Sequence, residues 1–156
     1  MGSILNRFAP IQTGLWIVIL LMSTSCGQNQ ADEPPRAAQI HQSWELQPGD
    51  EIGNYRVVAG LGDITIDLDG NSIYAPFEGR VQPSTQEDCV IFSSAEVPAY
   101  LFRLCGIRRP KLGQLQEGQV IGSGEYLHFA ALRRQPNGKW AIVEPSSQIL
   151  ERTLSQ

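Results

Sequence analysis

Short runs of strand character make up the sequence from Trp44 onward, and glycine, proline or asparagine separates one run from the next. In Tyr55–Leu61 and Ile64–Asp69 an apolar residue stands at every second position, which places the apolar side chains on one face of a strand. Further runs of this kind cover Ser72–Ala75, Gly79–Gln82, Cys89–Ser93, Ala99–Leu104, Glu125–Arg133 and Lys139–Glu144. About nine short strands in roughly 105 residues predict an all-β domain, folded as a compact sandwich or barrel.

The strongest turn signal is Pro136-Asn137-Gly138, which lies between the last two of these runs. Asn-Gly tolerates positive φ, so this tripeptide predicts a hairpin between two neighbouring strands. Only Ser146–Leu154 shows a weak helical period. We therefore expect the β domain to cover residues 44–150 and residues 151–156 to be a tail.

The first 25 residues have the order of an export leader. A short segment with Arg7 precedes the unbroken apolar run Gly14–Met22, and the small residues Ser23–Ser25 follow it. The apolar run has about half of the roughly 20 residues that a membrane-spanning helix needs. The pattern predicts a signal peptide over residues 1–25 and a protein that works in the cell envelope, outside the cytoplasm.

Small residues directly before Cys26, with Gly27 after it, resemble the cleavage site of bacterial lipoproteins. The resemblance implies a lipid on the sulfur of Cys26, which would anchor the protein to a membrane. Ser23 departs from the lipoprotein pattern, which has an aliphatic residue three places before the cysteine. The alternative is ordinary cleavage nearby and a secreted protein with an unmodified Cys26. Residues 26–43 are polar and have no apolar period, so they are predicted to be a flexible tether.

Two further cysteines, Cys89 and Cys105, belong to the predicted β domain. If Cys26 carries a lipid, they form an even pair in an oxidising compartment, where a disulfide persists. Closing a loop of this length stabilises a fold by about 3 kcal/mol in the chain-entropy model. The alternative is a pair of buried thiols, because both cysteines stand beside apolar residues.

The charge balance argues against one class of partner. The chain has 12 Lys and Arg against 16 Asp and Glu, a formal net charge of −4. Nucleic acid is not an expected partner, because phosphate binding requires many clustered bases. Two small basic clusters could meet carboxylates of cell-wall peptides or lipid headgroups, and the alternative for both is a solvated turn. Their members are Arg103, Arg108, Arg109 and Lys111, and then Arg133, Arg134 and Lys139.

Three segments stand in order along the predicted domain: Ile73–Val81 (IYAPFEGRV), Gln116–Gly122 (QEGQVIG) and Tyr126–Phe129 (YLHF). In sequence and order they resemble the lysostaphin-type (LytM-like) peptidoglycan endopeptidases. The first is similar to that family's I-Y-A-P-x-x-G-x-V strand and turn, the second to its glycine turn, and the third to its His-Leu-His-Phe strand. The resemblance covers about residues 60–146. It implies a small barrel-sandwich hybrid, the duplicated hybrid motif.

The resemblance also implies where catalytic zinc ligands would stand. The family uses an early His-x-x-x-Asp pair and the second histidine of the later strand. His128 matches that second histidine, but Tyr126 stands where the first, usually assigned as the general base, belongs. Ala59–Asp69, where the early pair belongs, contains no histidine, and Asp63 or Asp67 is a loose counterpart of the aspartate. A catalytic zinc needs three protein ligands, so we expect neither a cofactor nor catalysis.

These observations lead to one hypothesis with two alternatives. The hypothesis is a membrane-tethered, catalytically inactive LytM-like domain whose vestigial groove, with Tyr126, His128 and Asp67, binds peptidoglycan or an envelope protein. The resemblance implies that such a domain could regulate a cell-wall hydrolase. The alternatives are a structural envelope module without a small ligand, and a weak zinc metallohydrolase with unforeseen ligands.

Overall fold

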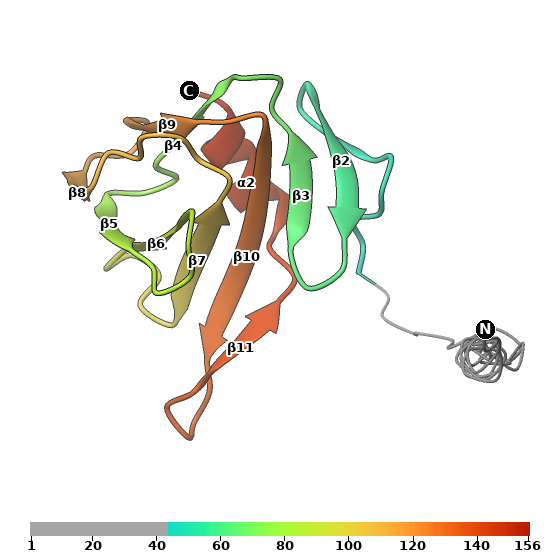
Figure 1. The fold of residues 1–156 in the computed structure, drawn as a ribbon. Coiled ribbons are helices and arrows are strands. Elements are labelled where there is room, and N and C mark those ends of the chain that lie inside the picture. The colour runs from blue at the N-terminus through green and yellow to red at the C-terminus, as the bar shows by residue number, and fades with distance from the viewer. Residues whose placement is uncertain (1–43) are drawn as a thin grey trace, which may run out of the picture. The chain divides into compact units, whose positions relative to one another are not determined.

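The computed structural model describes residues 44–156 (Figure 1). The predicted signal peptide, the anchor at Cys26 and the tether lie outside the described residues. No helix in the described part of the chain is long and apolar enough to cross a membrane. The described residues form antiparallel β-structure with one short helix, which agrees with the prediction of an all-β domain.

Nine strands form one antiparallel sheet in the order β1-β2-β3-β10-β7-β6-β5-β8, with β11 paired to β10 as well, and β4 and β9 form a second sheet. The elements are β1 (Glu51–Ile52), β2 (Tyr55–Gly60), β3 (Ile64–Asp67), β4 (Ser72–Tyr74), β5 (Gly79–Pro83), β6 (Cys89–Ser93), β7 (Tyr100–Cys105), β8 (Gly113–Leu115), β9 (Val120–Ser123), β10 (Tyr126–Arg134), β11 (Trp140–Val143) and α2 (Ser147–Leu154).

Each strand predicted from the sequence is present, with ends that differ by at most two residues. The prediction missed β1, β8 and β9, which have two, three and four residues. These segments show no clear alternation of apolar and polar residues. They are strands because of their partners: β8 pairs with β5, and β9 pairs with β4.

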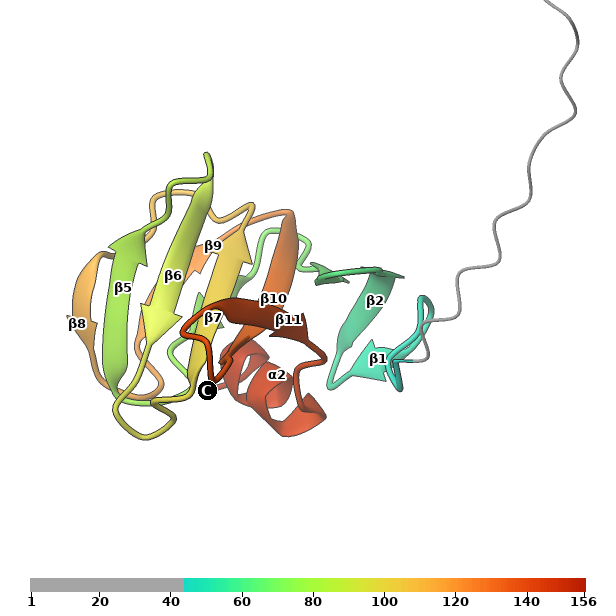
Figure 2. The ribbon, with the colours of Figure 1, turned by 90° about the horizontal axis from the view of Figure 1, so that it is seen from below.

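The core lies against one face of the large sheet. Phe92, Phe102 and Phe129 come from β6, β7 and β10 and lie side by side, with ring centroids 6.4 and 5.6 Å apart. Leu150 and Leu154 of α2 belong to the same core cluster, so the helix lies on the core side of the sheet (Figures 1 and 2). A chain that begins after Cys26 contains every core residue of the described part of the molecule.

The helix α2 corrects the predicted end of the domain. Ser146 caps it by accepting a hydrogen bond from the Ile149 amide at its hydroxyl oxygen. Leu154 is only 4% exposed, because residues four apart lie on the same face of a helix and Leu150 is in the core. Residues 151–154 are therefore part of the domain, and the expected tail over residues 151–156 is wrong.

The predicted hairpin joins β10 to β11 through Pro136-Asn137-Gly138. The Gly138 amide donates to the Gln135 carbonyl at 2.9 Å, and the Gln135 amide donates to the Lys139 carbonyl at 2.7 Å. Gly138 has a φ of 80°, whereas Asn137 is not among the residues with positive φ. The loop is therefore a β-turn followed by a left-handed glycine, rather than the two-residue turn with positive φ at both positions.

Candidate functional site

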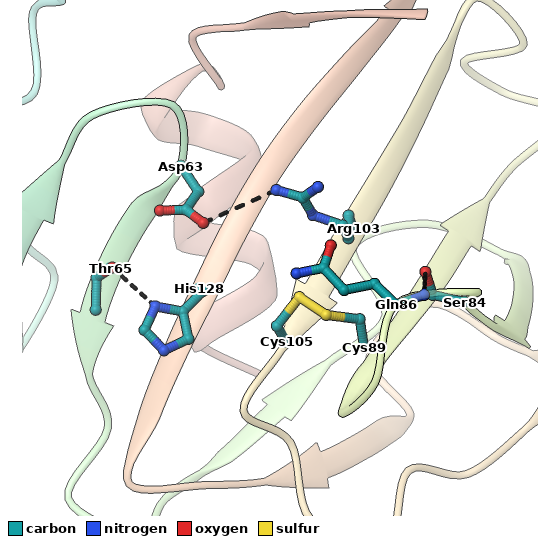
Figure 3. Close-up of a disulfide and its surroundings, with 8 residues drawn as sticks. All are labelled: Asp63, Thr65, Ser84, Gln86, Cys89, Arg103, Cys105 and His128. Atoms are coloured by element: carbon teal, nitrogen blue, oxygen red, sulfur yellow. Dashed lines mark hydrogen bonds and ion pairs between the residues drawn. A yellow bond between two sulfur atoms is a disulfide. The ribbon is translucent and has the colours of Figure 1, made fainter.

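Four side chains form a row across the sheet, on the face opposite the core (Figure 3). His128 on β10 stands opposite Thr65 on β3 and opposite Cys105 on β7, and Cys105 stands opposite Cys89 on β6. Residues paired across antiparallel strands point to the same face, so the register alone brings these four together. In Figure 3 α2 lies behind β10, and the row lies in front of it. We call this surface, from Asp67 to the disulfide, the outer face.

His128 is the centre of the outer face. Its Nδ1 lies 2.9 Å from the Oγ1 atom of Thr65, a side chain that is itself only 8% exposed. A hydroxyl can donate to or accept from an imidazole nitrogen, so this contact is compatible with either neutral tautomer. The contact holds the half-buried ring in place. Because Nδ1 contacts Thr65, Nε2 is the ring nitrogen that remains for a ligand.

Tyr126 and Asp67 stand directly opposite each other on β10 and β3, two residues from His128 and Thr65. The structure therefore brings the three predicted groove residues to one face of two neighbouring strands. The Asp67 carboxylate accepts a hydrogen bond from the Asp69 amide at 3.2 Å, within its own turn. Tyr126 is 44% exposed, so its ring is presented to solvent.

At the other end of β3, the Asp63 carboxylate forms an ion pair with an arginine side chain. Its Oδ2 atom lies 3.9 Å from Nη2 of Arg103 on β7, and both side chains are partly exposed (Figure 3). A partly exposed pair at this distance contributes little to stability. The Arg103 Nε atom is buried without a hydrogen-bond partner among the described residues. Sequence reasoning did not pair these two residues, because forty positions separate them and only the order β3-β10-β7 brings them near each other.

The disulfide forms the part of the outer face next to His128. The sulfur atoms of Cys89 and Cys105 lie 1.98 Å apart, at disulfide distance, as the cysteine count predicts. Both residues are less than 10% exposed. In Figure 3 the Gln86 side chain lies beside the bond, on the loop that precedes β6. The bond links β6 to β7 and so makes this part of the outer face rigid.

Two glycines beside His128 allow a close backbone approach. A Cβ atom on Gly106, whose φ is 80°, would lie 2.5 Å from the Tyr126 carbonyl oxygen. A Cβ atom on Gly124 would collide with the Gly106 carbonyl oxygen. Side chains at either position would therefore push the end of β7 away from the start of β10. Sequence reasoning did not single out these glycines, since nothing local distinguishes them from turn glycines.

The side chains of the outer face do not fit a catalytic zinc. Within residues 44–156, no group of three or more His, Cys, Asp or Glu side chains is placed to hold a metal ion. The outer face offers one imidazole, while Asp67 bonds within its turn and Asp63 faces Arg103. Three protein ligands and an open position are needed for catalysis by zinc. The zinc that the sequence resemblance implies therefore has no ligand set in this part of the chain.

No model of a known protein family matches the sequence, and no curated protein matches it significantly.

Proposed function

We propose that this chain is an exported lipoprotein, anchored through Cys26, with a non-catalytic LytM-like domain that binds a component of the cell envelope. In this proposal the domain is a small barrel-sandwich hybrid and the outer face is its binding surface. The bound component is peptidoglycan or a protein that acts on it. One observation carries the proposal: the His128 imidazole is hydrogen-bonded to the neutral Thr65 hydroxyl, and residues 44–156 contain no group of side chains that could hold a metal ion with it.

The groups on the outer face suit recognition of a polar polymer. Tyr126 provides an exposed aromatic ring, and His128 and Arg103 add hydrogen-bonding nitrogens within two residues along neighbouring strands. Binding sites for peptides and sugars combine an apolar or aromatic surface with a few convergent polar groups. The disulfide and the two close glycines support a rigid surface, which lowers the entropy lost on binding.

Co-sedimentation with purified peptidoglycan sacculi tests this proposal. Residues 27–156, produced without a lipid, are expected to sediment with sacculi, or else to capture a wall hydrolase from an envelope extract. The Tyr126→Ala variant is expected to lower the affinity by about tenfold, since a central aromatic contact typically contributes more than 1 kcal/mol. Its melting temperature should stay close to that of the parent chain, because the side chain is 44% exposed.

Trp140→Ala is the matched control. Trp140 is 40% exposed, close to the value for Tyr126, but it stands near the far end of the β10–β11 hairpin. This variant should retain wall binding. If the parent chain binds neither sacculi nor an envelope protein, the outer face is not a recognition surface and the structural-module alternative is correct.

A further inference from the structure

Positive charge is concentrated on the β10–β11 hairpin. Between Glu125 and Glu144 the chain contains Arg133, Arg134 and Lys139 and no acidic residue. All three basic residues are exposed. The whole chain has a formal net charge of −4, so the hairpin has the opposite sign to the rest of the molecule.

One face of the same hairpin is apolar and exposed. Trp140 is 40% exposed and Ile142 is 46% exposed, both on β11. Trp140 stands opposite Arg134, and Ile142 stands opposite Leu132, so these four side chains share a face. An indole, two aliphatic side chains and a guanidinium group therefore lie together on a strand pair.

A hollow of about 610 Å³ adjoins the turn end of the hairpin. Its lining residues are Pro98, Ala99, Arg133, Arg134, Gln135 and Pro136. The Arg134 amide donates to the Ala99 carbonyl at 2.8 Å, which holds the hairpin against the preceding loop. Arg133 and Arg134 both border the hollow, although successive residues of a strand point to opposite faces. Either guanidinium group can bind phosphate oxygens in a bidentate manner.

The hairpin also projects from the sheet. At the bottom of Figure 1 its tip extends beyond the other strands of the domain. An extended surface could therefore touch the tip without first meeting the rest of the described chain.

We infer that the β10–β11 hairpin is a membrane contact, which binds anionic lipid headgroups at the surface of a bilayer. Cations are attracted to anionic leaflets, and tryptophan prefers the membrane–water interface. The proposed anchor would keep such a surface within reach, since the 18 residues from Cys26 to Trp44 span at most about 60 Å. The inference goes beyond that anchor, because the hairpin would bind lipid on its own and would set how the domain faces the membrane.

The experiment uses residues 27–156 without a lipid, so that it does not depend on whether Cys26 is modified. Trp16 lies in the predicted leader, so Trp44→Phe leaves Trp140 as the only tryptophan of this chain. Vesicles of phosphatidylglycerol and phosphatidylcholine should shift Trp140 emission to shorter wavelength, and the chain should float with them. Vesicles of phosphatidylcholine alone should do neither, and high salt should reverse the binding.

Paired charge variants locate the contact. Arg134→Gln with Lys139→Gln should lower partitioning into anionic vesicles by about 25-fold, or roughly fivefold for each cation. Arg56→Gln with Arg80→Gln removes two exposed arginines from β2 and β5 and should leave partitioning unchanged. An equal loss in both double variants, or an unchanged Trp140 emission with anionic vesicles, would overturn the inference. So would binding of the β11 edge to a protein strand without any binding to vesicles.

The same variants separate this inference from the proposed function. Tyr126→Ala should lose wall or protein binding and keep vesicle binding, whereas Trp140→Ala should do the opposite. Loss of both activities in either variant would show that one surface serves both, and the hairpin would then not be a separate contact.

Discussion

Among single residues, His128 bears most directly on whether the outer face could bind zinc. Its Nδ1 atom is occupied by the Thr65 hydroxyl, whereas a histidine that binds a metal usually donates its second nitrogen to a carboxylate or a carbonyl. Tyr126 presents a phenol where the proposed LytM-like resemblance would place an imidazole, and the Asp67 carboxylate accepts a hydrogen bond within its own turn. His128 therefore has no partner among these side chains that could complete a zinc ligand set.

The purified chain is therefore expected to hold less than one zinc ion per molecule after incubation with zinc and dialysis. It should also leave purified cell walls intact, because no third ligand stands near His128 in the described residues. Metal analysis by mass spectrometry and a turbidity assay of wall suspensions measure the two quantities. Stoichiometric zinc together with wall lysis that a chelator abolishes would favour the metallohydrolase alternative.

Among the elements, β10 has the largest role in building the outer face. Its first half pairs with β3, its second half pairs with β11, and its other edge pairs with β7. Because of this, one strand holds Tyr126 and His128 near its start and leads into the basic hairpin at its end. The close approach at Gly106 fixes where β7 ends relative to the start of β10.

Replacing Gly106 with alanine tests how much the close packing of Gly106 against the Tyr126 carbonyl matters for stability. Gly106 and Gly138 both have a φ of 80°, but a Cβ atom on Gly138 would meet nothing within 4 Å. Gly138→Ala should therefore cost only the backbone penalty of about 1 kcal/mol. Gly106→Ala should cost about 1–3 kcal/mol more, because the methyl group also meets the Tyr126 carbonyl. Urea unfolding gives the free energy of unfolding of both variants. Equal losses would show that the close packing at Gly106 does not contribute to stability.

On the scale of the whole molecule, the two faces of the sheet differ in composition. The core face carries the phenylalanines and packs against α2, while the outer face carries the polar row of Thr65, His128 and the disulfide. The proposed anchor would hold this domain at a membrane, and the hairpin would then orient it. Such an arrangement would keep the outer face close to the cell wall.

The anchor itself makes a direct prediction. The full-length protein, expressed with its leader, should partition with membranes, and Cys26→Ala should release it or leave it unprocessed. The reason is that a thioether-linked lipid buries many methylene groups, each contributing about 0.8 kcal/mol. Membrane fractionation and mass spectrometry of the mature N-terminus measure both effects. A plain N-terminus downstream of Cys26 would contradict lipidation and leave a secreted protein.

The sequence by itself determined the all-β class, eight of the eleven strands in the described residues and the position of the hairpin. These depend on local alternation and on turn residues, which act over a few positions. It also indicated which cysteines pair, because two remain once Cys26 is set aside. Only the tertiary structure decided the neighbours of His128, the pairing of Asp63 with Arg103 and the burial of Leu154. Strand order and register join residues that lie far apart in the chain, and no local pattern contains that information.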